Sequence, residues 1–287
     1  MTGSPIALVT DSASQLSPSL ADRFGTIVVP VTVTLAGVDH LEGVDLTVDD
    51  FYQQLSDSPN AELSTTQPSA AAFAAAFESA IADGAAEILA IVVGSAYSGA
   101  VNSAEVAARA VVTRHAGVTI DVFDSGTASF GIACAVWAAA DAIAGGHDLA
   151  AVKRAAADRA VHTSSVFVID GLDLARRSGR FGAVDFSSAS NKGVAVLSSG
   201  PAGLEVVGDA TSAADAIDLM VGFLAASAQP IRTAVGWASP ELDQVTATFR
   251  KRLRAEPSVV EVVDYRVGPS IAVHTGPNTV GAFMFPG

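Results

Sequence analysis

Short apolar runs and longer alanine-rich segments alternate along the first half of the chain. Residues 6–9 and 88–93 are continuous apolar runs, a pattern typical of strands covered on both faces, and residues 118–123 form a further predicted strand. The segments from 100 to 111 and from 129 to 144 have the composition of helices. Strand, turn and helix repeated in this order predict a parallel sheet flanked by helices, an α/β fold.

The pattern changes after about residue 182, where strands become shorter and a hairpin is predicted to join two of them. The predicted strands are 193–197, 204–207, 233–237, 259–267, 271–273 and 282–285, and the predicted helices are 212–225 and 240–254. This mixture predicts a smaller α+β domain. We place the two domains at 1–165 and 166–287.

Three of the predicted strands in the first half end in polar residues, including Asp11, Ser95 and Asp124. The carboxyl ends of parallel strands share one edge of a sheet, and ligands bind at that edge. The turn at 94–99 also precedes a helix, so free backbone N–H groups and the hydroxyls of Ser95 and Ser98 predict an anion site there. The alternative is a local role, with Ser98 as an N-cap and Ser95 as a turn residue.

Charge and hydropathy exclude some classes of partner. The 287-residue chain has 30 acidic and 16 basic residues, a net charge of -14, which disfavours nucleic acid as a partner. Although 50% of the residues are hydrophobic, no apolar run has the roughly 18–20 residues of a membrane span, so the protein is predicted not to be integral to a membrane. No basic region precedes Ile6, which predicts a cytoplasmic protein without a signal peptide.

The usual catalytic signatures are missing from the sequence. It contains no dinucleotide-binding glycine motif, Walker loop, His-Glu-x-x-His or Gly-x-Ser-x-Gly, and its histidines lack metal-ligand spacing, so no cofactor or metal is predicted. One enzymatic alternative is a serine hydrolase with Ser95 or Ser98 as nucleophile, His274 as base and Asp11 or Asp124 as the orienting carboxylate. A small-molecule sensor domain is a further alternative.

Five separated motifs, taken together, resemble those of the DegV family. They are Val-Thr-Asp-Ser at 9–12, Thr-Thr-Gln-Pro-Ser at 65–69, Gly-Ser-Ala-Tyr-Ser-Gly at 94–99, Ser-Gly-Arg at 178–180 and His-Thr-Gly-Pro-Asn-Thr at 274–279. They occur in the family's order and span nearly the whole chain. The resemblance implies a two-domain, non-enzymatic carrier that encloses one long-chain fatty acid. It also implies that a separate fatty acid kinase phosphorylates the bound carboxylate and that the acyl phosphate enters phospholipid synthesis.

The resemblance also implies roles for individual residues. The hydroxyls of Thr65 and Ser95 match those that bind the carboxylate, and His274 matches the histidine of the last motif. Ser98 and Thr275, which lie in the same motifs, complete the predicted ligand-binding set.

Arg180 matches the arginine that faces the kinase in this family. The chain departs from the family pattern at three motif positions, with Gly94 for a serine, Tyr97 for a leucine and Asn278 for a glycine.

Overall fold

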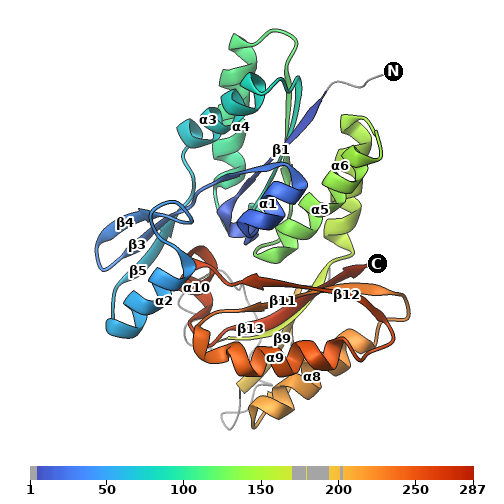
Figure 1. Cartoon of the computed structure of the whole chain (residues 1–287). Helices are drawn as coiled ribbons and strands as arrows, with labels where there is room; N and C mark the ends of the chain where they lie inside the picture. The colour runs from blue at the N-terminus through green and yellow to red at the C-terminus, as the bar shows by residue number, and fades with distance from the viewer. Residues whose placement is uncertain (1–4, 170–178, 180–193, 201–202) are drawn as a thin grey trace. The chain divides into compact units, whose positions relative to one another are not determined.

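The computed structural model describes residues 5–169, 179, 194–200 and 203–287. The chain divides into two compact units (Figure 1). The first comprises Met1–Thr47 and Ala61–Ala160, and the second comprises Val48–Asn60 and Val161–Gly287. Residues 48–60, which the predicted division placed in the first domain, therefore belong to the second unit.

The first unit contains a four-stranded parallel sheet in the order β2-β1-β6-β7. Helices α3 and α4 cover one face, and α1 and α5 cover the other (Figure 1). The bounds are β1 (Ile6–Asp11), η1 (Ser12–Ser14), α1 (Pro18–Phe24), β2 (Thr26–Val29), α3 (Ala70–Ala82), β6 (Glu87–Val92), α4 (Ala100–Arg114), β7 (Thr119–Asp124), α5 (Phe130–Ala144) and α6 (Leu149–Val161). The predicted parallel sheet with flanking helices is confirmed.

The core of this unit forms around the central strand β6. Its apolar residues from Ile88 to Val92 are 0% exposed, as expected for a strand covered on both faces. On α5 the buried face includes Phe130 and Trp137, and Trp137 packs 5.4 Å from the ring of Phe24.

A small antiparallel sheet, in the order β4-β3-β5, completes the first unit. Its strands are β3 (Thr32–Leu35), β4 (Val38–Leu41) and β5 (Leu63–Thr66). Pro30 interrupts the apolar segment at 26–35 and separates β2 from β3, which lie in different sheets. The sequence around β5 is polar and has an irregular pattern. Pairing with β3 makes it a strand, because tertiary context overrides weak local preference.

The second unit is built on a six-stranded sheet in the order β10-β9-β8-β13-β11-β12, with α8 and α9 on one face (Figure 1). Only β11 and β12 pair in parallel, and β9 and β10 form the predicted hairpin. The bounds are α2 (Val48–Asp57), β8 (Ser164–Val168), β9 (Val194–Gly200), β10 (Gly203–Ala210), α8 (Ala213–Ala225), β11 (Ile231–Trp237), η3 (Pro240–Leu242), α9 (Asp243–Leu253), β12 (Val259–Arg266), α10 (Pro269–Thr275) and β13 (Val280–Pro286).

One predicted strand of this unit is a helix. Residues 271–273 lie within α10, so His274 occupies the last turn of a helix rather than the end of a strand. Pro269 stands in the first turn, where it fits a helix, and the N–H groups of Ile271 and Ala272 donate to the carbonyl oxygen of Gly268. The predicted strand at 271–273 is therefore wrong. An apolar run of three residues is too short for its periodicity to distinguish a strand from a helix.

Helix α2 is attached to the second unit by polar contacts of its first turns. The Tyr52 hydroxyl donates to the carbonyl oxygen of Val267 at 2.7 Å. Arg266 donates to Asp49 at 3.0 Å, and its guanidinium lies 5.9 Å from the centre of the Tyr52 ring. These long-range contacts place α2 with a sheet whose strands come much later in the sequence.

The helix predicted at 172–177 lies outside the described residues. Among the residues that the structure does describe, no helix combines the length and apolar character needed to cross a membrane.

Candidate functional site

The three polar turns meet at the carboxyl edge of the parallel sheet, as predicted. The Asp11 carboxylate at the end of β1 accepts a hydrogen bond from the N–H of Val93 at 2.8 Å. The Asp124 carboxylate at the end of β7 accepts one from the N–H of Ser95 at 3.1 Å. The segment that follows the central strand is therefore held by a carboxylate on each side.

Asp11 belongs to a buried structural cluster. It is 0% exposed and also accepts the N–H of Ala13 at 3.1 Å. Burial raises the pKa of Asp11 to about 7; hydrogen bonds from the Val93 and Ala13 N–H groups oppose the rise, and the nearby Glu42 carboxylate adds to it.

Ser12 connects this cluster to the chain beyond β2 and β4. Its hydroxyl donates to the Glu42 carboxylate and accepts the N–H of Val31 at 2.9 Å. Because both hydrogen-bonding roles of the hydroxyl are used within the protein, Ser12 is a structural residue.

Asp124 has a different environment, although its position in the sheet is similar. It is half-buried and accepts the N–H of Gly126 at 2.9 Å in addition to that of Ser95. Burial raises the pKa of Asp124, but hydrogen bonds from the Ser95 hydroxyl and from the two N–H groups outweigh it and hold the pKa below its ordinary value. Asp124 thus contacts Ser95 directly, whereas a hydrolase triad needs an imidazole between carboxylate and serine.

Several backbone N–H groups of the 94–99 turn have acceptors within the protein. Gly94 donates to Thr127 O at 2.8 Å, Tyr97 and Ser98 donate to Gly94 O at 2.9 and 3.2 Å, Gly99 donates to Gln67 Oε1 at 3.1 Å, and Ala100 donates to Ser98 Oγ at 3.2 Å. These donors are engaged by the protein's own oxygens, so they do not contribute to the predicted anion site. Helix α4 begins at this turn without a side-chain cap, and the anion site stays a prediction for its first-turn donors.

Gly94 is required by the close approach of the loop that follows β7. A Cβ at this position would lie 2.8 Å from the carbonyl carbon of Gly126 and 2.9 Å from the nitrogen of Thr127. This contact explains the first departure from the family pattern. It also holds Asp124, at the start of that loop, beside Ser95.

Gln67 joins the Thr65 motif to the central turn. Thr65 lies on β5, opposite Val33, and is half-buried. Two residues later, the Gln67 amide accepts the N–H of Gly99 at 3.1 Å and donates to the Ser103 hydroxyl at 3.4 Å. The first unit therefore brings the motifs that contain Thr65, Ser95 and Ser98 together.

The remaining predicted residues belong to the second unit. His274 is half-buried on α10, and the buried Thr275 donates its hydroxyl to the carbonyl oxygen of Ile271 at 3.3 Å. The Thr279 hydroxyl donates to the carbonyl oxygens of Thr275 and Gly276, at 3.0 and 2.9 Å, and so fixes the turn after the helix. Arg180 lies outside the described residues.

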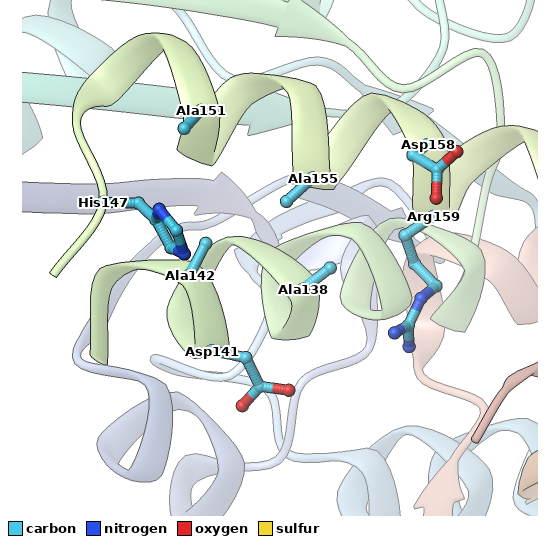
Figure 2. A pocket seen from close by; sticks show the side chains of 8 residues that line it. All are labelled: Ala138, Asp141, Ala142, His147, Ala151, Ala155, Asp158 and Arg159. Atoms are coloured by element: carbon cyan, nitrogen blue, oxygen red, sulfur yellow. The ribbon is translucent and has the colours of Figure 1, made fainter. Parts of the chain in front are cut away.

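A groove that the sequence did not predict lies between α5 and α6, with a volume of about 410 Å³ (Figure 2). Its lining consists of Ala138, Asp141, Ala142, His147, Ala151, Ala155, Asp158 and Arg159. Small residues at matching positions let the two helices approach, which accounts for the alanines. Its mixed charges define no ligand class, so the carboxyl edge of the sheet remains the candidate site.

Among the described residues, no group of three or more histidine, cysteine, aspartate or glutamate side chains is placed to hold a metal ion.

Comparison with known proteins identifies the family. The sequence profile of the DegV family matches residues 5–287. The chain belongs to the DegV family. A DegV domain-containing protein of Streptomyces coelicolor is 32% identical over 285 residues, covering 97% of this chain and 98% of the relative. One from Mycobacterium tuberculosis is 29% identical over 283 residues, covering 96% and 95% of the two chains.

Solved structures of DegV proteins share the fold. A DegV family protein from Thermus thermophilus, described by its fatty acid binding, is 27% identical with a TM-score of 0.84, over 98% of this chain and 99% of that one. DegV of Bacillus subtilis, described as a fatty acid binding protein, is 22% identical with a TM-score of 0.84, over 99% and 100% of the two chains. The predicted family and fold class are confirmed. None of these comparisons supports the serine hydrolase alternative.

Proposed function

We propose that this DegV protein binds one long-chain fatty acid and presents its carboxylate to a separate fatty acid kinase. The observation that carries the proposal is the full-length similarity to the Thermus protein, which is known for fatty acid binding and is 27% identical to this chain. In this function the protein is a cytoplasmic carrier, and the chemistry belongs to the kinase.

The carboxyl edge of the sheet supplies groups suited to one end of such a ligand. Ser95 is exposed there, and Gln67 links the segment of Thr65 to the same turn. A fatty acid site needs a few placed polar groups at one end of an apolar cavity. We assign the head-group contacts to Thr65, Ser95, Ser98, His274 and Thr275.

Native mass spectrometry of the purified protein tests the binding of the lipid. We expect about one fatty acid per chain to co-purify, and delipidated protein to take up added oleate or palmitate. A protein that is free of lipid as isolated and takes up neither acid would contradict the proposal.

Substitution tests the assigned head-group residues. Thr65→Ala, Ser95→Ala and His274→Ala should each weaken fatty acid binding by roughly 1–3 kcal/mol, the cost of losing a hydrogen bond to a charged or buried group. Thr66→Ala is the matched control, because Thr66 is exposed and points to the opposite face of β5 from Thr65. Unchanged affinity in all three variants would reject the assignment.

Arg180 is proposed to dock the kinase. It follows the exposed Gly179, whose φ of 64° marks a turn, and a positive side chain on a chain of net charge -14 is suited to steering a partner. Arg180→Ala should leave lipid affinity unchanged but slow phosphorylation of the bound acid by the cognate kinase. Arg109→Ala, on the exposed surface of α4, is the control for loss of one positive charge. Loss of lipid binding with normal turnover per bound lipid would contradict this role.

A further inference from the structure

Helix α10, which carries His274, is held at both of its ends by hydrogen bonds within the second unit. Just before the helix, the Val267 N–H donates to the carbonyl oxygen of Trp237 at 2.9 Å. Just after it, the Ala238 N–H donates to the carbonyl oxygen of Thr279, also at 2.9 Å. The orientation of this seven-residue helix therefore depends on how the segments on either side of it are fixed.

The second backbone polar group of Val267 is bound by helix α2. Its carbonyl oxygen accepts the Tyr52 hydroxyl at 2.7 Å, so that both the N–H and the C=O of this residue are hydrogen-bonded. Tyr52 is 4% exposed and Val267 is 2% exposed. The next residue, Gly268, supplies the carbonyl oxygen that accepts the first N–H groups of α10. A shift of Val267 would therefore move the start of the helix that carries His274.

Magnitudes single out Tyr52 among the polar contacts that α2 makes with this segment. Asp49 accepts a hydrogen bond from Arg266 at 3.0 Å, but its side chain is 78% exposed, and exposed ion pairs contribute little free energy. The Tyr52 hydrogen bond is buried, where water does not compete for the donor or the acceptor, so its loss has the larger effect. Helix α2 thus fixes the segment before α10 mainly through one buried hydroxyl.

We propose that Tyr52 is a positioning residue for His274, and that α2 thereby sets the affinity of the protein for the lipid head group. This inference rests on the proposed function and concerns the same site. Tyr52 acts without touching the ligand. A binding side chain that is already held in its bound orientation loses less freedom when the ligand arrives, which improves affinity. Residues 48–60, which stand between β4 and β5 in the chain, then serve the head-group residue of the second unit.

The test measures the dissociation constant for oleate by isothermal titration with delipidated full-length protein. Tyr52→Phe removes the hydroxyl but keeps the ring, whose centre lies 5.2 Å from that of Phe51. We expect the dissociation constant to rise by about three- to tenfold, the size of one neutral hydrogen bond. Asp49→Ala, on the same helix, is the matched control and should change the dissociation constant by less than about twofold.

Two further measurements separate positioning from a general loss of stability. In a His274→Ala background, Tyr52→Phe should no longer change the dissociation constant, because the side chain that it positions is missing. In the ligand-free protein, NMR spectra of the histidine rings should show that Tyr52→Phe moves the His274 signals. The signals of His115, which is hydrogen-bonded to Glu78 at 2.6 Å in the first unit, should stay in place.

The outcomes distinguish this inference from the proposed function. The inference is wrong, and the carrier function stands, if the wild type binds oleate but Tyr52→Phe binds it within about twofold of the wild type. It is also wrong if Tyr52→Phe leaves the His274 ring signals in place or weakens binding equally in the His274→Ala background. A wild type that takes up no oleate and carries no lipid when isolated would instead contradict the proposed function.

Discussion

Asp11 and Asp124 occupy equivalent places at the ends of two parallel strands that flank β6. Each carboxylate accepts one N–H from two residues further along its own turn and one from the segment after β6. Their pKa values nevertheless move in opposite directions, to about 7 for Asp11 and below the ordinary value for Asp124.

Access to water accounts for the difference. Asp11 is 0% exposed and has Glu42 near it, so burial and repulsion both favour its neutral form. Asp124 is half-buried, and its hydrogen bonds with Ser95 and Gly126 hold its pKa below the ordinary value. Similar backbone hydrogen bonds therefore accompany a buried carboxyl that favours its neutral form at one strand end and a half-buried carboxyl that favours its ionised form at the other.

The largest test of this comparison is the pH dependence of stability. A carboxyl whose folded-state pKa is raised stabilises the fold below its unfolded pKa, and this contribution is lost as pH rises toward the folded pKa. For Asp11 the window runs from 3.8 to about 7. Across this window the free energy of unfolding falls by about 4 kcal/mol, because each pKa unit between the folded and unfolded states corresponds to roughly 1.4 kcal/mol. Urea unfolding from pH 4 to 8 should show Asp11→Asn gaining stability relative to wild type by about this amount, and parallel curves would contradict the buried, protonated Asp11.

The serines beside the two carboxyl groups should separate structural from binding roles. Ser12→Ala removes the hydrogen bonds that Ser12 makes with the Val31 N–H and the buried Glu42 carboxylate, so we expect a loss of roughly 1–3 kcal/mol in the free energy of unfolding. Ser95→Ala, at an exposed site, should change stability by less than about 0.5 kcal/mol while weakening lipid binding. Urea denaturation measures both variants. Equal losses of stability would contradict a structural role for Ser12 that Ser95 does not share.

Gly94→Ala tests the packing that holds Asp124 in place. The added Cβ would lie 2.8 Å from the Gly126 backbone, so the loop must shift, at a cost of about 1–3 kcal/mol in unfolding free energy. The matched control is Gly222→Ala in α8, where a Cβ would meet nothing within 4 Å. There we expect a gain of about 0.5–1 kcal/mol, because alanine favours a helix. A neutral Gly94→Ala variant would contradict the tight loop contact.

The smallest effect concerns Asp124 itself. A lowered pKa stabilises the fold above the unfolded value of 3.8, and the contribution is lost as pH falls through the folded-state pKa. Asp124→Asn should therefore change the pH dependence of stability only below about pH 4, in the opposite sense to Asp11→Asn. Thermal unfolding between pH 2.5 and 5 measures it. A difference between wild type and Asp124→Asn that develops between pH 5 and 8 would place Asp124 in the same class as Asp11.

Local patterns predicted most of the regular structure but not how the turns use their donors. The apolar run before Gly94 and the alanine-rich helix after it follow directly from residue type. The acceptors for that turn come from Gln67, Asp124 and Thr127, which lie up to about thirty residues away in the sequence. No local pattern indicates such partners, so the turn was predicted to be an open anion site.

The same limit applies to α10 and α2. Apolar Ile271 to Val273 fit either a strand or a helix, and the start at Pro269 decides between them. Helix α2 belongs to the second unit through contacts with Arg266 and Val267, which come more than two hundred residues later in the sequence.

The chain order of α2 has a consequence for synthesis. Residues 48–60 leave the ribosome long before β11 and β12, the strands of their own unit, have been translated. Until then the aromatic rings of Phe51 and Tyr52, 0% and 4% exposed in the finished protein, lack their final surroundings. Domains generally fold as units. The first unit must therefore fold while its thirteen-residue insertion, residues 48–60, still lacks the strands of the second unit. In a nascent chain that ends before residue 259, α2 would therefore be exposed and accessible to a chaperone.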